Sequence, residues 1–289
     1  MKAVQILIIL SLMIQLSDCS PGDTKKSSDP FARENLIAWC IVPFDANHRT
    51  PEQRAKMLND LGITRLAYDY RDEHIPSFRE EISVLKEHGI ELSAVWMWVE
   101  PEGEKNLSSS NRSILEILEG TGTETELWVS FPAHVFEGLP DTAKLNRAVA
   151  ILTDLLRRAG RIGCTIALYN HGDWFGEPEN QVKIIQALGS DGVKIVYNFH
   201  HAHHQTDQFG EILELMMPYL STINLNGMRK EGPKIIPLGD GDRELGMIRA
   251  VKDAGYRGSI GIIGHTEGED IRIVLERNLE GLRKILDQI

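Results

Sequence analysis

Four of the chain's ten histidines, His200, His201, His203 and His204, lie within five consecutive positions. An imidazole titrates near neutral pH, so it can carry a proton between reacting groups or bind a metal ion in its neutral form. Three imidazoles are enough to hold zinc, which makes a metal centre one interpretation. A polar surface loop is the alternative. Because one loop cannot direct four such side chains at one point, we expect at least two of them to face solvent.

A second stretch with candidate chemistry is YNHGDWFGEPENQ, residues 169–181. Aromatic side chains such as Trp174 can stack on the apolar faces of sugars, while amides such as Asn170 bind sugar hydroxyls. Glu177 is a candidate general base. In the competing interpretation, Trp174 packs the loop onto the protein and Glu177 caps the next helix.

The elements that must position these residues follow a repeating pattern of an apolar strand-like run, a loop and an amphipathic helix. Most of the runs are apolar on both faces, which is typical of parallel strands covered on both sides. The eight runs are residues 36–44, 64–70, 91–98, 126–133, 164–170, 193–199, 221–226 and 259–264.

Helix signals separate these runs. Thr50, Pro51 and Gln53 form a predicted capping box at the start of one helix, and Ser77 with Glu80 repeats the pattern at the next. Eight such units predict a (β/α)8 TIM barrel as a single domain over residues 36–289. A doubly wound open sheet is the second choice, because no glycine-rich phosphate fingerprint follows the first strand.

Side chains alternate between the two faces of a strand, so one parity of each run should point into the barrel. Active sites of such barrels lie at the carboxyl ends of the strands. In each run, one set of alternate positions carries the polar side chains, and the other set is mostly Leu, Ile, Val and Tyr. The polar set is therefore the candidate inward face. Near the strand ends the polar parity gives Asp69, Arg71, Trp96, Trp98, Tyr169, His171, Asn198, His200 and Asn226.

The N-terminus differs in character from the rest. Residues 1–19 contain one lysine and a 14-residue apolar run, which is shorter than the roughly 20 residues that span a bilayer. We predict a signal peptide over 1–19, a polar linker over 20–35, no transmembrane segment, and an exported protein, periplasmic or secreted. Cys19 is a candidate lipid-anchor site, as in a lipoprotein. The net charge of −11 argues against a nucleic-acid partner.

Taken together, the barrel pattern and several strand ends resemble the xylose isomerase-like superfamily of sugar isomerases and epimerases, which includes endonuclease IV. The resemblance runs from AWCIVPFDANHRTPEQR to GHTEGEDIRIVLERNLEGLRKIL, and it includes YNH at 169–171 and NFHHA at 198–202. It implies a divalent metal held by the fifth to eighth strands. The positions that match those ligands are Tyr169, Asn198, Asn224 and Gly264, and none is an anionic ligand at neutral pH.

The family's metal chemistry is therefore not carried over, and the resemblance leaves a sugar-directed enzyme that abstracts a proton next to a carbonyl. The alternatives are a non-catalytic carbohydrate-binding barrel and, less favoured, an endonuclease IV-like phosphoesterase. Zinc or manganese is a candidate cofactor. Candidate catalytic residues are His171, Glu177, His200 and His201. Candidate residues for a carbohydrate substrate are Asp69, Trp96, Trp98, Tyr169, Asn170, Trp174, Asn198 and Asn226. Candidate metal ligands are His171, His200, His203 and His265.

Overall fold

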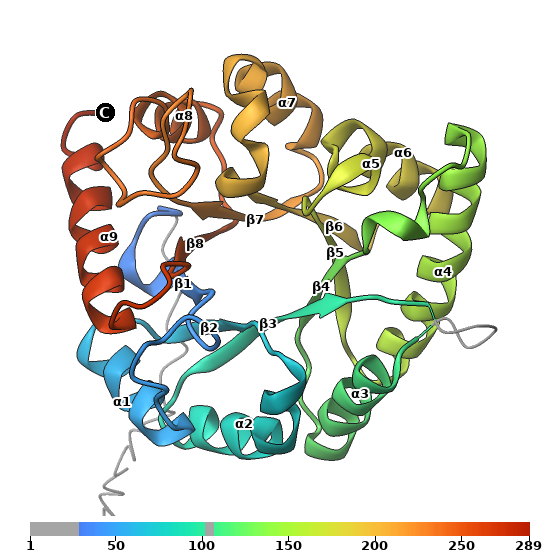
Figure 1. The fold of residues 1–289 in the computed structure, drawn as a ribbon, viewed down its shortest axis with the longest axis horizontal. Helices are drawn as coiled ribbons and strands as arrows, with labels where there is room; N and C mark the ends of the chain where they lie inside the picture. Colours follow the sequence, from blue (N-terminus) through green and yellow to red (C-terminus); the bar gives the residue numbers. More distant parts are fainter. Residues whose placement is uncertain (1–28, 102–106) are drawn as a thin grey trace, which may run out of the picture.

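The structure, a computed structural model, describes residues 29–101 and 107–289. In this part of the chain, eight parallel strands pair in chain order and close into a barrel (Figure 1). The strands are β1 Leu36–Trp39, β2 Arg65–Tyr68, β3 Glu91–Trp98, β4 Glu126–Ser130, β5 Thr165–Tyr169, β6 Val193–Asn198, β7 Leu220–Leu225 and β8 Ser259–Ile263. The predicted (β/α)8 TIM barrel is confirmed.

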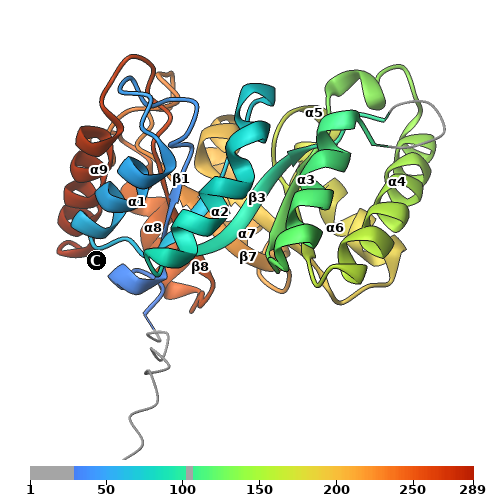
Figure 2. The same cartoon turned by 90° about the horizontal axis from the view of Figure 1, so that it is seen from below.

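Helices form an outer layer around the strands (Figures 1 and 2). They are α1 Pro51–Asp60, α2 Phe78–Glu87, α3 Ser109–Thr121, α4 Asp141–Arg161, α5 Asp173–Gly176, α6 Pro178–Leu188, α7 Phe209–Met216, α8 Glu244–Asp253 and α9 Ile271–Leu286. Short 3-10 helices are η1 Arg33–Asn35, η2 Asp72–Ser77, η4 Ala133–Val135 and η5 Phe199–Gln208. None of the helices described here is long and apolar enough to cross a membrane.

The N-terminal boundary is described only in part. The predicted signal peptide, residues 1–19, and residues 20–28 of the predicted linker lie outside the described residues. The last residues of that linker pack against the barrel, because Phe31 is buried in the core and the Asn35 side chain donates to the Asp29 carbonyl at 2.6 Å.

Two local predictions need correction. The first strand is four residues long rather than nine, because Cys40 adopts a φ of 56° and turns the chain out of the sheet. The capping box of Thr50 and Gln53 forms as predicted. Ser77 makes no side-chain cap, because η2 runs directly into α2 and the Ser77 hydroxyl donates to the His74 carbonyl instead.

The core has two shells. The larger shell fills the space between the strands and the helices. The smaller shell fills the barrel itself and is built from three large rings set among Ala, Val, Ile and Cys side chains. Trp39 and Trp128 pack edge to face with ring centroids 4.9 Å apart, and Tyr169 stacks on Trp128 at 6.1 Å. These rings form a solid floor beneath the carboxyl ends of the strands.

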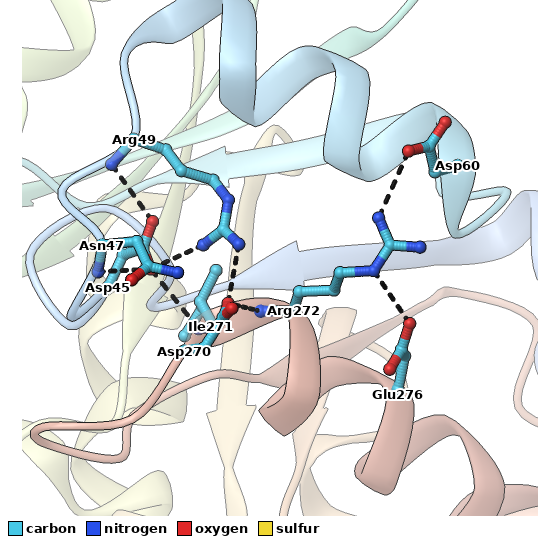
Figure 3. Close-up of polar contacts among 8 residues, drawn as sticks. All are labelled: Asp45, Asn47, Arg49, Asp60, Asp270, Ile271, Arg272 and Glu276. Atoms are coloured by element: carbon cyan, nitrogen blue, oxygen red, sulfur yellow. Dashed lines mark hydrogen bonds and ion pairs between the residues drawn. The ribbon is translucent and has the colours of Figure 1, made fainter.

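The first and last units are joined by ion pairs near this end of the barrel (Figure 3). Arg49, in the loop after β1, contacts Asp45 and Asp270 at 2.7 Å each. Asp270 also caps α9 by accepting from the backbone N–H of Arg272. The side chain of Asp45 is almost fully buried, so the guanidinium compensates a carboxylate that water cannot solvate.

Candidate functional site

A cavity opens at the carboxyl end of the barrel, where such barrels carry their active sites. Its volume is about 420 Å³, including the space open to solvent at its mouth. The lining residues are Trp39, Cys40, Phe44, Asp69, Arg71, Trp96, Tyr169, His171, Asn198, His200, His201 and His265.

Six strands, namely β1, β2, β3, β5, β6 and β8, supply this lining from their ends or from the segments that directly follow them. On these strands, the residues expected to point into the barrel do reach the cavity. Asp69, Trp96, Tyr169, His171 and Asn198 all face the cavity, as the alternation of strand side chains predicts.

The four histidines of residues 200–204 do not all point the same way. His200 and His201 both line the cavity, whereas His204 is exposed and its Nε2 lies 3.1 Å from Glu177. Two adjacent residues can face one cavity because β6 ends at Asn198 and the chain continues as the 3-10 helix η5. The Asn198 side chain fixes this turn by accepting from the backbone N–H of His200 at 3.1 Å.

Four imidazoles gather in the cavity. The ring of His201 lies 4.2 Å from that of His200 and 4.3 Å from that of His171, between centroids. His265 follows β8 and lies 5.4 Å from His200, with its other face against Phe44 at 3.8 Å. The Nδ1 of His171 is buried and has no hydrogen-bond partner among the described residues, so it is available to a ligand.

Burial keeps these imidazoles neutral. It lowers the pKa of His200 to about 4 and that of His201 to about 2, and the neighbouring histidines lower both further. The pKa values of His171 and His265 are also lowered, again chiefly by burial. A neutral imidazole carries one N–H donor and one acceptor nitrogen, so each ring can donate to or accept from a bound sugar.

Asp69 brings a carboxyl group to the same cavity. Its Oδ1 accepts a long hydrogen bond from the Val42 N–H at 3.4 Å, and its Oδ2 is buried with no partner in the described part of the chain. Burial raises the pKa of Asp69 to about 7, although the nearby Arg71 opposes the rise. The group can therefore exist in both protonation states near neutral pH.

Arg71 and Trp96 form one wall of the cavity. The Arg71 guanidinium lies 5.7 Å from the ring centroids of both Trp96 and Phe44, a distance at which a cation is attracted to an aromatic face. Trp96 is fixed by its Nε1, which donates to the Ser130 hydroxyl at 3.0 Å. Trp98 lies beyond Trp96, in an adjoining groove that shares Arg71, Trp96 and His171 with the cavity.

Several predicted residues have structural partners instead. Asn170 bridges β5 and β6, because its side chain accepts from the Asn198 N–H and donates to the Asn198 carbonyl. Asn226 donates to the backbone carbonyls of Gly227 and Lys234. Trp174 packs against Phe136 at 5.3 Å between ring centroids.

Two candidate chemical groups also lie elsewhere. Glu177 immediately precedes α6 and accepts from Gln205 and His204 near the surface, which leaves it outside the residues that line the cavity. The His203 ring contacts the backbone carbonyl of Arg229, so of the four predicted metal ligands it is the one directed away from the cavity.

The four positions at which the resemblance implies a metal do not fit a hard cation. The Tyr169 hydroxyl accepts from Trp39 Nε1 at 3.2 Å and from the Asn198 side chain, and burial raises its pKa well above the usual value. Asn224 fills the space above Gly261, where an added Cβ would lie 1.8 Å from its Oδ1. Gly264 offers no side chain. Magnesium and manganese require carboxylate oxygens, which these positions lack.

A metal held by histidines alone is a separate prediction. Within the described residues, no group of three or more His, Cys, Asp or Glu side chains is arranged to hold a metal ion. His171, His200 and His265 nevertheless share the cavity, so these three remain the candidate ligands.

Three lining residues were not among the site candidates that the sequence suggested: Trp39, Cys40 and Phe44. The alternation of strand side chains could have found Trp39, because it has the same parity as Ile37 in the barrel interior. Cys40 itself adopts a left-handed backbone conformation, and Phe44 lies in the loop that follows it. Neither the spacing nor the residue types of the first run signal that turn.

Comparisons with known proteins agree with this architecture. The E. coli 3-keto-D-glucoside 4-epimerase YcjR, in its apo form, superposes with a TM-score of 0.66 at 13% identity, over 88% of this chain and 99% of that chain. A D-psicose 3-epimerase with D-tagatose from Clostridium cellulolyticum H10 superposes with a TM-score of 0.61 at 13% identity, over 88% of this chain and 98% of that chain. The IOLI protein with a bound zinc atom superposes with a TM-score of 0.65 at 12% identity, over 88% of this chain and 98% of that chain.

At these identities the three structures show a shared fold. No curated protein matches the sequence significantly. The family model described as "Xylose isomerase-like TIM barrel" matches residues 61–285, which is most of the chain. The chain therefore belongs to the xylose isomerase-like TIM barrel family.

Proposed function

We propose that this protein is a sugar isomerase or epimerase that moves a proton at a carbon next to a carbonyl, without the carboxylate-held metal of its family. One observation carries the proposal: the cavity contains a buried carboxyl group, Asp69, with one oxygen that lacks a partner among the described residues. Proton abstraction needs a base of suitable pKa and a group that stabilises the oxygen of the resulting enediolate.

Asp69 is the proposed base. With a pKa raised to about 7 by burial, it is a stronger base than an ordinary carboxylate and is still about half ionised at neutral pH. It takes the proton from the carbon next to the carbonyl, and returning that proton to the neighbouring carbon isomerises the sugar, with a hydroxyl proton passing to the former carbonyl oxygen. Epimerisation needs a second donor on the opposite face of the enediolate, a role open to one of the cavity imidazoles, which delivers a proton taken from water. The reaction is balanced within the substrate, because the same proton or one from water replaces the one removed.

The imidazoles and Arg71 are proposed to act on the carbonyl oxygen. Neutral His171, His200 and His201 can each donate an N–H hydrogen bond to it without carrying a full charge. The guanidinium of Arg71 is a permanent positive charge at the cavity wall, so it stabilises negative charge that develops on oxygen in the transition state. Trp96 offers a flat face for the sugar ring.

A non-catalytic sugar-binding barrel is the second candidate. It is favoured by the loss of anionic side chains at Tyr169, Asn198, Asn224 and Gly264. The same loss weighs against an endonuclease IV-like phosphoesterase, and so does the net charge of −11, because DNA binding needs a positive surface.

Deuterium exchange separates turnover from binding. Ketoses, aldoses and keto-glycosides are first screened for binding by isothermal titration calorimetry. Those that bind are then incubated with the protein in D2O, and NMR follows deuterium at the carbon next to the carbonyl. We expect exchange with the wild type and a loss of ~10²–10⁴ in rate for Asp69→Asn, with His204→Gln unchanged. Binding without any exchange would favour the non-catalytic barrel.

Export is a further part of the proposal. It rests on the short apolar run of residues 3–16 behind a single lysine, which is typical of a signal peptide. Mass spectrometry of the protein recovered from its native host should find residues 1 to about 19 absent, and a lipid on Cys19 would appear as added mass at a new N-terminus. An intact Met1 in the cytosolic fraction would contradict export.

A further inference from the structure

A groove adjoins the cavity and shares three lining residues with it. Arg71, Trp96 and His171 lie on both, so a molecule bound over these side chains can extend from one into the other. The groove has a volume of about 1250 Å³ including its open side, compared with about 420 Å³ for the cavity. The cavity suits a small ligand, and the groove leaves room for a second unit joined to it.

Aromatic faces lead from the cavity into the groove. Trp96 lines both, Trp98 lines the groove, and their ring centroids are 5.5 Å apart with planes at 43°. His171 continues this surface, because its ring lies 5.0 Å from Trp98 in an edge-to-face contact. Neighbouring aromatic faces can contact the apolar faces of neighbouring sugar rings, whereas a single free monosaccharide in the cavity would leave Trp98 unused.

Polar side chains also line the groove. Ser108, Ser109 and Ser110 line it together with Asn111. Asn111 is buried and held by its Nδ2, which donates to the Trp98 carbonyl at 2.9 Å and contacts the Tyr70 hydroxyl at 3.3 Å. Its Oδ1 is buried and, within residues 29–101 and 107–289, has no partner. A hydroxyl donor from a ligand would satisfy that oxygen.

The charges of the groove decide the class of ligand. Among the described residues, three carboxylates, Asp72, Glu73 and Glu100, line it together with one guanidinium, that of Arg71. Carboxylates accept hydrogen bonds from hydroxyl groups but repel a phosphate or a sulfate. The groove therefore favours an uncharged unit that is rich in hydroxyls.

We propose that the substrate is a neutral glycoside of at least two sugar units, with the reacting ring in the cavity and the second ring on Trp98 in the groove. This inference rests on the proposed function for the identity of the reacting site. It separates this protein from an enzyme for free monosaccharides and from one for sugar phosphates.

Binding, rather than turnover, tests the inference. Calorimetry compares glucose, galactose and mannose with their methyl glycosides, their disaccharides and glucose 6-phosphate. We expect at least one disaccharide to bind at least tenfold more tightly than its constituent monosaccharide, and the phosphate to bind more weakly than glucose. Trp98→Ala should reduce the affinity for that disaccharide to the level of the monosaccharide and leave the monosaccharide affinity unchanged.

Two further variants guard against an indirect effect through His171. Ser109→Trp, at an exposed position on the groove wall, should block the second unit without touching the cavity. Tyr219→Ala removes a partly buried aromatic just before β7, at the opposite end of the barrel, and should change neither affinity. Equal losses for both sugars in Trp98→Ala and Ser109→Trp, or no disaccharide that binds more tightly than its monosaccharide, would overturn the inference.

The two proposals fail separately. Tighter binding of a disaccharide without deuterium exchange would retain the groove and remove the proposed reaction. Deuterium exchange with a monosaccharide, without tighter binding of any disaccharide, would support the proposed reaction and contradict the proposal that the substrate is a glycoside.

Discussion

Asp69 illustrates how one residue can link the stability of the barrel to its chemistry. Its side chain is buried, and burial raises its pKa in the folded protein to about 7, compared with about 4 in an unfolded chain. The folded state therefore binds the proton more tightly than the unfolded state. The stabilisation from this group is complete below the unfolded pKa and is lost as the pH rises through about 7.

Asp69→Asn should remove this pH dependence. We compare the free energy of unfolding of the variant with that of the wild type at pH 5 and at pH 8. The difference, variant minus wild type, should be on the order of 3 kcal/mol larger at pH 8, because only the wild type must bury a charge at the higher pH. The lowered pKa values of the four cavity histidines act in the opposite direction, but they are present in both proteins and cancel in the difference. Urea unfolding at the two pH values gives the measurement. A pH-independent difference would show that Asp69 does not titrate in this range.

The histidines give a second prediction at the residue scale. His200→Gln or His201→Gln should lower the rate of deuterium exchange by ~10²–10⁴, because glutamine keeps roughly the size of the side chain but removes the proton chemistry. His204→Gln is the matched control, since His204 belongs to the same run but its side chain is exposed beside Glu177. Near-wild-type exchange in both cavity variants would reduce the run to a structural turn.

At the scale of elements, the closure of the barrel depends on contacts between loops that are far apart in sequence. Arg49 joins the loop after β1 to the start of α9 through Asp45 and Asp270 (Figure 3). Nearby, Arg272 joins α9 to Asp60 at the end of α1 and to Glu276 within α9, but its side chain and both partners are substantially exposed. The same residue type thus serves a buried and an exposed network side by side.

Arg49→Met should therefore cost ~3 kcal/mol of unfolding free energy, because it leaves the buried Asp45 carboxylate without its cation. Backbone N–H groups of Asn47 and Arg49 still donate to Asp45, so we expect a value near the lower end for a broken buried pair. Arg272→Met should cost much less than Arg49→Met, because exposed ion pairs contribute little to stability. Chemical denaturation of both variants provides the comparison, and equal losses would show that burial does not set the difference.

The elements also show how far sequence reasoning reaches. Eight apolar runs separated by helix signals were enough to predict the closed barrel, and strand alternation placed Asp69, Trp96, His171 and Asn198 at the cavity. The prediction was incomplete where the chain leaves regular geometry. The turn at Cys40 and the 3-10 helix η5 depend on backbone conformations that strand parity cannot describe. Glu177 lies outside the cavity lining, because the chain before it folds into α5 and its carboxylate accepts from Gln205 near the surface.

At the scale of the whole molecule, the chain has the barrel of its family, while the positions at which the resemblance implies a metal carry no carboxylate. The interior of the barrel is packed with Trp39, Trp128 and Tyr169, and the Tyr169 hydroxyl is engaged by Trp39 and Asn198. The proposed route uses side chains alone and no carboxylate-held metal. This makes the response to metals a property that distinguishes this protein from a metal-dependent relative.

We expect neither magnesium nor manganese at millimolar concentration to raise the midpoint of thermal unfolding. Tyr169, Asn198, Asn224 and Gly264 present no carboxylate oxygen to such ions, and an ion that does not bind the folded state cannot stabilise it. Treatment with EDTA should likewise leave the rate of deuterium exchange within about twofold of the untreated protein. Elemental analysis of protein purified without chelators completes the test, because imidazoles bind zinc without any carboxylate. One equivalent of zinc, with exchange lost on chelation and restored by zinc, would show instead that the cavity histidines hold a catalytic metal.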